Sequence, residues 1–170
     1  MSEIQLVLAN LNERDVSFLH RCYTSREVRG LFQPCRNVSR ENVAKEISSC
    51  CDIRRFVFIV RSGESDAGCA YAHYIQTYDH YEIGASLLPA MRGRGIGTAA
   101  HKLLIHRMFR TYEARRLHAI VSTRNCAEMK VLESCRFTRE GVVRSAGFLD
   151  GVWHDLAFYG LLSSEFREPE

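Results

Sequence analysis

The feature that most constrains this chain is a glycine-rich stretch, MRGRGIGTAAHKL, which runs from Met91 to Leu103. Three of its glycines occupy alternate positions, two arginines stand among them, and apolar residues at helical spacing follow at once. The preceding residues have the alternation of a strand. The stretch therefore predicts a strand, a turn with bare backbone and then a helix that begins at about residue 95.

Such a turn suits a phosphate group. The first amides of a helix have no intrahelical partner, and the helix dipole makes them partly positive, so anions bind there. Glycines remove the Cβ atoms that would keep a pyrophosphate away from these amides, and Arg92 and Arg94 can add charge-assisted contacts. The alternative is a glycine turn without a ligand. A P-loop is excluded because Gly97 is followed by Thr98-Ala99, and a dinucleotide fingerprint would need its third glycine at position 98.

The rest of the chain predicts one α/β domain that spans residues 1–170. Its sheet is mixed but mostly antiparallel and is flanked by helices. Asp150-Gly151 is a strong signal for a type I′ hairpin between the last two strands. Strands are predicted over residues 4–9, 56–60, 69–78, 80–88, 117–122, 139–149 and 152–162, a turn over 63–68, and helices from about 12, over 39–51, from about 95 and over 125–135. The inward positions of the two later helices are predicted to be Ile96, Ala100, Leu103, Leu104 and Met108, and then Ala127, Val131 and Leu132.

Composition excludes several classes of partner. Lys+Arg 23 against Asp+Glu 20 gives a net charge of +3, and no basic run is interleaved with aromatic residues, so nucleic acid is not expected. The opening MSEIQLVLAN has no signal core and no stretch is long enough to span a membrane, so a cytoplasmic protein without a membrane partner is expected. The seven cysteines include no CxxC and no zinc-finger spacing, which predicts reduced thiols, the adjacent Cys50 and Cys51 among them, and no metal.

The glycine stretch also carries a family resemblance. RGRGIG matches the Arg/Gln-x-x-Gly-x-Gly/Ala signature of the GNAT superfamily of acetyl-CoA-dependent N-acetyltransferases. EIGASLLPAMRGRGIGTAAHKLL, STRNCAEMKVLESCRFTREGVVR and LDGVWHDLAFYGLL resemble successive landmarks of the branch that contains the ribosomal-protein N-terminal acetyltransferases. The resemblance covers roughly residues 3 to 163 and implies a GNAT fold with acetyl-CoA as co-substrate.

The resemblance implies roles for particular residues. Backbone groups of Leu87 and Leu88 would bond the acetyl carbonyl and the pantetheine amides. Asn125 matches an asparagine that contacts the pantetheine arm or the adenosine-side phosphates, although it is equally suited to cap the helix that it opens. The residues implied to surround the pyrophosphate are Arg92, Gly93, Arg94, Gly95, Ile96, Gly97 and Thr98.

Glu82 is the candidate general base, since several members of the family carry a glutamate at the equivalent strand position. Strand alternation places it on one face with Gly84 and Ser86, although a straight strand would separate it from Leu87 by ~16 Å. The alternative is a structural carboxylate paired with an arginine. The tyrosine that usually protonates the leaving thiolate is replaced by Leu132, which leaves the general acid open.

The predicted function is N-acetyl transfer from acetyl-CoA to a primary amine by direct attack in a ternary complex. A relay through Cys135 is a weaker alternative. A second hypothesis is a GNAT-like module that binds CoA or another phosphorylated ligand without turnover. A small-molecule amine and a protein N-terminus are both open as acceptors, and a homodimer is a candidate oligomeric state. The aromatic residues expected to rim the acceptor pocket are Tyr74, Tyr78, His80 and Tyr81.

Overall fold

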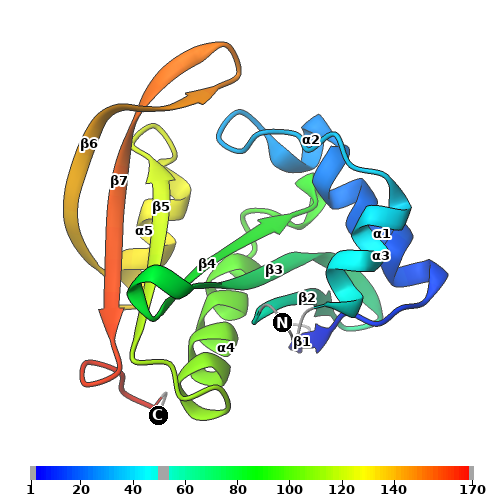
Figure 1. Cartoon of the computed structure of the whole chain (residues 1–170), viewed down its shortest axis with the longest axis horizontal. Helices are drawn as coiled ribbons and strands as arrows, with labels where there is room; N and C mark the ends of the chain where they lie inside the picture. The colour runs from blue at the N-terminus through cyan, green and yellow to red at the C-terminus, as the bar shows by residue number, and fades with distance from the viewer. Residues whose placement is uncertain (1–2, 50–53, 169–170) are drawn as a thin grey trace.

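The computed structural model describes residues 3–49 and 54–168 of the chain, and these form one seven-stranded sheet with helices on both faces (Figure 1). The strand order is β1-β2-β3-β4-β5-β7-β6, and every neighbouring pair is antiparallel except β4–β5. The mixed, mostly antiparallel sheet predicted from the sequence is therefore confirmed.

The strands are β1 (Ile4–Leu8), β2 (Arg55–Ser62), β3 (Ser65–Ile75), β4 (His80–Leu87), β5 (Arg116–Ser122), β6 (Thr138–Leu149) and β7 (Val152–Leu162). The helices are α1 (Glu13–Thr24), α2 (Arg26–Arg29), α3 (Arg40–Ser48), α4 (Ile96–Arg110) and α5 (Cys126–Ser134), with short 3-10 turns η1 (Gln76–Tyr78) and η2 (Pro89–Met91).

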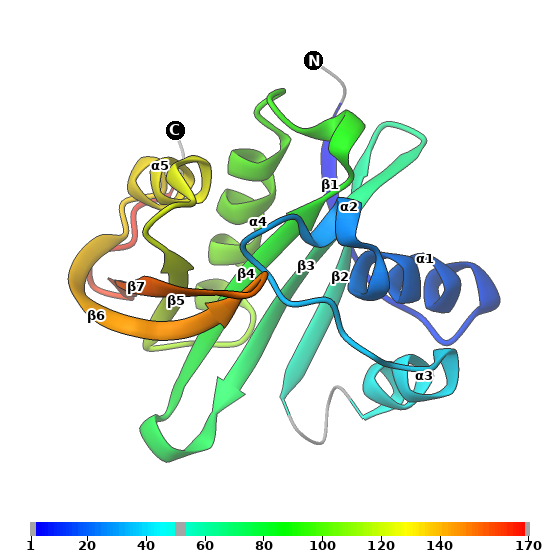
Figure 2. The ribbon, with the colours of Figure 1, turned by 90° about the horizontal axis from the view of Figure 1, so that it is seen from above.

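The helices divide the core into two layers. Seen from above, α4 lies on one side of β2, β3 and β4, while α1 and α3 lie on the other (Figure 2). Strand β2 serves both layers, because its side chains alternate between the two faces. Phe58 and Val60 belong to the cluster beneath α4, and Val57 and Ile59 to the cluster beneath α1 and α3. This explains why residues 56–60 are apolar without interruption.

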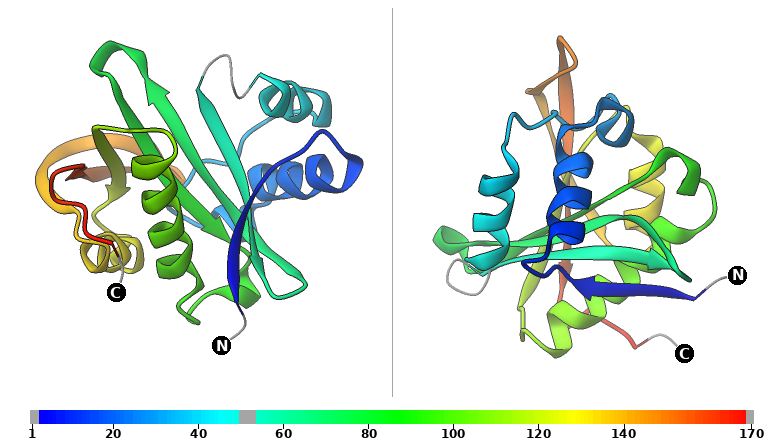
Figure 3. Two further views of the ribbon diagram at one scale, coloured as in Figure 1. Left: turned by 90° about the horizontal axis from the view of Figure 1, so that it is seen from below. Right: turned by 90° about the vertical axis from the view of Figure 1, so that its right-hand side faces the viewer.

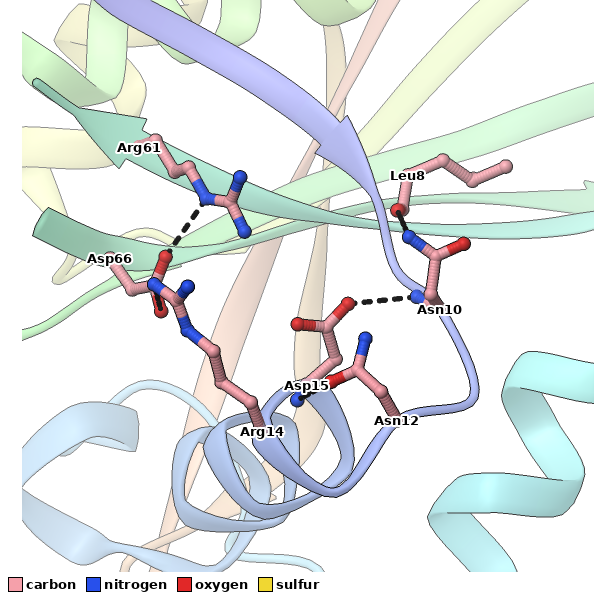
Figure 4. Close-up of polar contacts among 7 residues, drawn as sticks. All are labelled: Leu8, Asn10, Asn12, Arg14, Asp15, Arg61 and Asp66. Carbon is pink, nitrogen blue, oxygen red and sulfur yellow. Dashed lines mark hydrogen bonds and ion pairs between the residues drawn. The ribbon is translucent and has the colours of Figure 1, made fainter. Parts of the chain in front are cut away.

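The start of α1 is fixed by polar contacts next to β1 (Figure 4). The side chain of Asn12 caps the helix by accepting a hydrogen bond from the amide of Asp15 at 2.8 Å. The buried carboxylate of Asp15 accepts in turn from the amide of Asn10 at 2.9 Å. Arg14, one position earlier, pairs with Asp66 of β3 at 3.0 Å. These contacts anchor the start of α1 to the loop after β1 and to the start of β3.

Strands β4 and β5 separate soon after they meet. Their parallel pairing consists of Tyr81 with Leu117 and Glu82 with His118, whereas β4 remains paired with β3 as far as Leu87. Figure 1 shows the two strands diverging above this point, so the sheet opens into a V. Beyond Glu82, β4 therefore has no ladder partner on its β5 side within the described residues.

The structure corrects several details of the sequence interpretation. The four-residue helix α2 was not expected, and β3 already begins at Ser65, inside the predicted turn. Leu103 is 39% exposed, because the buried face of α4 is centred on Ala100 and Leu104 and extends instead to Ile105. Ala127 is exposed as well, and it lies at a cavity rather than in the core. No helix of the described residues is both long and apolar enough to cross a membrane.

The cysteines that the structure describes are free. Cys22, Cys69 and Cys135 are buried, and Cys35 and Cys126 are exposed. The predicted pair of adjacent thiols, residues 50 and 51, lies outside the described residues.

Candidate functional site

A cavity of about 690 Å³ lies where the V opens. Its walls come from the end of α2 and the loop that follows it, the end of β4, the glycine loop, the first turns of α4 and the first turns of α5. A second cavity, of about 730 Å³, lies between α4, the end of α5 and the C-terminal segment, and it contains no residue of the glycine loop. Among the predicted site residues, Leu87, Arg92, Gly93, Gly95, Gly97, Thr98 and Asn125 line the first cavity.

The glycine loop has the geometry of an anion cradle. Gly93 and Gly95 have φ of 71° and 76°, a region that strongly favours glycine, and Gly95 is the N-cap of α4 without a side chain to cap it. Apart from the adjoining residues of the chain, no heavy atom of the described residues lies within 4 Å of the place where a Cβ at either glycine would stand. A Cβ would therefore project into open space, where a ligand can approach the amides. The residues fit a phosphate-containing group.

The two arginines of the loop differ in what they contact. Arg92 donates from Nε to the carbonyl of Leu87 at 3.1 Å, and from Nη2 to the carbonyls of Glu27 and Val28 at 2.9 and 2.8 Å. These two carbonyls belong to the last turn of α2, so Arg92 joins the glycine loop to α2. Arg94 is exposed. Of the two arginines, Arg94 is thus the one whose side chain can meet a phosphate without giving up a contact within the described residues.

Leu87 and Leu88 have different environments. Leu87 lines the cavity, whereas Leu88 does not. The amide of Leu88 donates to the carbonyl of Ala67 at 2.9 Å, and its own carbonyl accepts from the amide of Met91 at the same distance. Leu87 is better placed than Leu88 for the role that the family resemblance implies, because it lines the cavity and only its carbonyl, which accepts from Arg92, has a partner described above, whereas both backbone groups of Leu88 do. The backbone roles themselves stay predictions.

Asn125 caps α5, as one of the two interpretations of this residue predicted. Its Oδ1 accepts from the amide of Glu128 at 3.3 Å, and the residue also lies on the cavity wall. Contact with a ligand stays a prediction. Ile96 is buried in the core beneath α4, so of this residue only the backbone could meet a ligand at the loop.

Glu82 stands at the apex of the V and is not itself among the residues that line the cavity, which on β4 are Ala85, Ser86 and Leu87. It is half-buried, its Oε2 lies 3.6 Å from Nε2 of His118, and its Oε1 accepts a hydrogen bond from the hydroxyl of Tyr71 at 3.3 Å. The interaction with His118, and then that with Tyr71, hold the pKa of Glu82 below its usual range despite the opposing effect of burial. Within the described residues its partners are thus a histidine and a tyrosine, not the arginine that the structural alternative assumed.

Tyr71 and His118 were not singled out from the sequence. A Cβ at Gly84 would stand 2.7 Å from the Tyr71 hydroxyl, so the missing side chain of Gly84 is what lets the phenol lie across β4. Burial, followed by the negative charge of Glu82, raises the pKa of Tyr71 and keeps it protonated. His118 faces Glu82 across the β4–β5 pair, and its Nδ1 is buried without a partner in the described part of the chain. Only strand pairing reveals these neighbours.

A buried histidine lies beneath the glycine loop. His101 is 1% exposed, its Nδ1 lies 3.0 Å from the carbonyl of Gly97, and its Nε2 lies 3.1 Å from Oε1 of Glu128 on α5. Burial lowers the pKa of His101, but the carboxylate of Glu128 and the Gly97 carbonyl together raise it above its usual value. The pair joins the first turns of α4 and α5 at the cavity wall.

The other candidates lie elsewhere. Cys135 is buried and lines the second cavity, and burial raises the pKa of its thiol, which does not favour a covalent relay. The aromatic cluster of the β3–β4 hairpin does form contacts, with Tyr74 and Tyr81 at 5.1 Å and Tyr78 and His80 at 5.7 Å between ring centroids. None of the four lines the cavity, because the hairpin lies at the opposite end of β4 from the glycine loop. The prediction that they rim this pocket was wrong.

The described residues contain no cluster of three or more His, Cys, Asp or Glu side chains that could hold a metal ion.

The family model described as the acetyltransferase (GNAT) domain matches residues 5–138. The chain belongs to this family, as the glycine stretch indicated.

Among curated proteins, the chain is 35% identical over 83 residues to the "Probable N-acetyltransferase YjcK" of Bacillus subtilis. That match covers 49% of this chain and 46% of the relative, so the chain spans about half the length of this relative.

Solved structures share the whole fold. The ribosomal alpha-N-protein acetyltransferase RimL in complex with coenzyme A superimposes with a TM-score of 0.80 at 19% identity, covering 98% of this chain and 97% of that one. A mutant of the spermidine N-acetyltransferase SpeG from Vibrio cholerae has a TM-score of 0.80 at 17% identity, with 95% of both chains covered.

Proposed function

We propose that this protein is an N-acetyltransferase that moves the acetyl group of acetyl-CoA to a primary amine by direct attack in a ternary complex. The observation that supports this most is the position of the glycine loop. It opens onto the same cavity as the unpaired edge of β4, and a carboxylate stands at the apex where β4 and β5 part. Residues 1–170 act as one domain in this proposal.

The glycine loop and the first amides of α4 would hold the pyrophosphate of the co-substrate, with Arg94 beside them. The free edge of β4 at Leu87, together with Asn125, would hold the pantetheine arm. Acetyl-CoA supplies the thioester carbonyl that is attacked. The relatives named above support this co-substrate, since RimL is described in complex with coenzyme A. No metal is needed for the reaction.

Glu82 would remove the proton from the acceptor ammonium, which must become a free amine before it can attack. Glu82 is ionised at neutral pH and can accept the proton directly or through water, although its lowered pKa makes it a weaker base than an ordinary glutamate. The Tyr71 hydroxyl and His118 hold the two carboxylate oxygens in place. The name of RimL refers to a protein N-terminus and that of SpeG to spermidine, so amines of different classes are acceptors for proteins of this fold.

Two measurements test this proposal. Calorimetry with acetyl-CoA shows whether the cavity binds the co-substrate, and a thiol-release assay against a panel of amines shows whether it is turned over. We expect micromolar binding and amine-dependent release of CoA thiol. Binding without release from any amine would favour the alternative of a non-catalytic module, and no binding would overturn both.

A further inference from the structure

We propose that the end of the cavity formed by Arg29, Gln33 and Ser86 binds an anionic oxygen group of the acceptor, so that the acceptor is a small amine that also carries a carboxylate or a phosphate ester. This inference rests on the proposed function and names the substrate class of the same site. The three residues come from α2, the loop after it and β4, and all three line the cavity.

Arg29 is a half-buried cation without a counter-ion. Its Nε donates to the carbonyl of Pro34 at 3.1 Å, and its Nη1 lies 3.4 Å from the hydroxyl of Ser86. In the part of the chain that the structure describes, it forms no ion pair, whereas Arg26 of the same helix pairs with Asp150. A cation at a cavity wall that lacks a carboxylate partner is suited to an anion brought by a ligand.

Ser86 joins Arg29 to Gln33 at this end of the cavity. The Ser86 hydroxyl donates to Oε1 of Gln33 at 2.6 Å, which fixes the amide and leaves its nitrogen as a donor. Ser86 is 7% exposed, so its hydroxyl is held in place rather than solvated. The guanidinium of Arg29 and the amide oxygen of Gln33 both contact this hydroxyl, so the guanidinium and the remaining N–H groups of the amide are the donors that a carboxylate or phosphate would meet.

The opposite charge lies farther along the same face of β4. Glu82 and Ser86 both point to this face, four residues apart, which corresponds to ~13 Å along a strand. The long side chain of Arg29 shortens the gap from one end, and an ammonium group held by Glu82 marks the other. A small zwitterionic acceptor bound at Arg29 would meet this charge directly and would reach the carboxylate of Glu82 through water.

The lining does not suit a polyamine. Among the described residues that line the cavity, Glu128 is the one carboxylate, and its charge is already directed at His101. A polycation would need several carboxylates, and here it would meet Arg29 instead. The fold is shared with a spermidine enzyme, but the charges at this wall point to a different acceptor.

Matched pairs of amines provide the test. Thiol release would be measured with the twenty common amino acids against their neutral amides, phosphoethanolamine against ethanolamine, and spermidine. The protein would be compared with Arg29→Gln, Arg29→Lys and the control Arg26→Gln, with acetyl-CoA affinity measured by calorimetry for each. The ratio of kcat/KM within a pair is read out, because a merely structural defect lowers both members equally.

We expect an anionic amine to be favoured over its neutral partner by roughly 10–100-fold, and Arg29→Gln to bring this ratio close to one. Arg29→Lys should restore part of the ratio, and Arg26→Gln should leave it unchanged. Comparing the amino acids with phosphoethanolamine shows whether a carboxylate or a phosphate ester is preferred. Preference for a neutral amide or for spermidine, or a ratio that Arg29→Gln does not alter, would overturn this inference while N-acetyl transfer stands. Failure of every amine despite measured acetyl-CoA binding would overturn both.

Discussion

The two ends of the cavity are built in different ways. The end at the glycine loop is made mostly of backbone, contributed by one continuous stretch from Leu87 to Thr98. The acceptor end is made of side chains, which α2, its following loop and β4 bring together from far apart in the sequence. A backbone site can bind a ligand that is common to a whole family, whereas a side-chain site can change its ligand through a few substitutions.

The largest expected effect separates chemistry from cofactor binding. Glu82→Gln removes the base but keeps the shape of the side chain, so kcat at neutral pH should fall by ~10²-fold. The affinity for acetyl-CoA should remain almost unchanged, because the glycine loop is untouched. Part of the rate should return as the pH rises and more of the amine is unprotonated. Steady-state kinetics across pH 6–9 measures this.

The matched control for this variant is Glu46→Gln. Glu46 is also a carboxylate with internal partners, since it pairs with Arg36 and Arg55, but it lies on α3. Its loss should reduce stability and leave kcat intact. Normal turnover of Glu82→Gln over the whole pH range would show that Glu82 is not the base.

The next effect concerns the backbone end alone. Gly95→Ala places a Cβ in the open space above the first turn of α4 and should weaken acetyl-CoA binding by roughly 10–100-fold. Gly151→Ala is its control, because Gly151 has a φ of 78° and equally open surroundings at the tip of the β6–β7 hairpin, which projects away from the sheet (Figure 3, right). Both variants carry a similar backbone cost. Equal loss of affinity in the two would remove the cradle interpretation.

A smaller effect distinguishes the two arginines of the loop. Arg94→Ala should weaken acetyl-CoA binding by about 1 kcal/mol, or roughly fivefold, and leave the melting temperature unchanged because the side chain is exposed. Arg92→Ala should instead lower the melting temperature, since three backbone carbonyls lose their donor. Thermal unfolding and calorimetry on both variants check this, and a stable Arg92→Ala protein would contradict it.

The smallest effect is on stability as a function of pH. Because the folded-state pKa of His101 is raised, its protonation stabilises the fold below the unfolded pKa of about 6.5, and this contribution is lost as the pH rises through the folded value. The melting temperature should therefore decline slightly between pH 6 and 8. The decline should be smaller in Glu128→Gln. The control Glu41→Gln, which removes one partner of the exposed ion pair with Lys45, should behave as the parent protein. An identical pH profile in all three would exclude the His101–Glu128 pair as its source.

The backbone end was predictable from the sequence because its signal is local. Glycines that need positive φ, a helix start and a preceding strand all lie within a dozen residues. The neighbours of Glu82 could not be predicted in this way, since Tyr71 and His118 contact it only through the pairing of β4 with β3 and β5. Helix α2 is too short for a periodic pattern, so Arg29 had no signal at all. The exposure of Leu103 was missed because a helix face cannot be located to within one residue from apolar spacing alone.

The contacts of Arg92 have a thermodynamic consequence. Its guanidinium links the turn before α4 to the last carbonyls of α2, and α2 ends in Arg29. Whatever steadies the turn therefore also steadies the wall on which Arg29 stands. Linkage is reciprocal, so an occupant at one end that raises the affinity of the other end has its own affinity raised by the same factor. The two substrates would in that case bind with positive cooperativity within one subunit. The cooperativity that is lost in Arg92→Ala would measure how much of the coupling passes through this side chain.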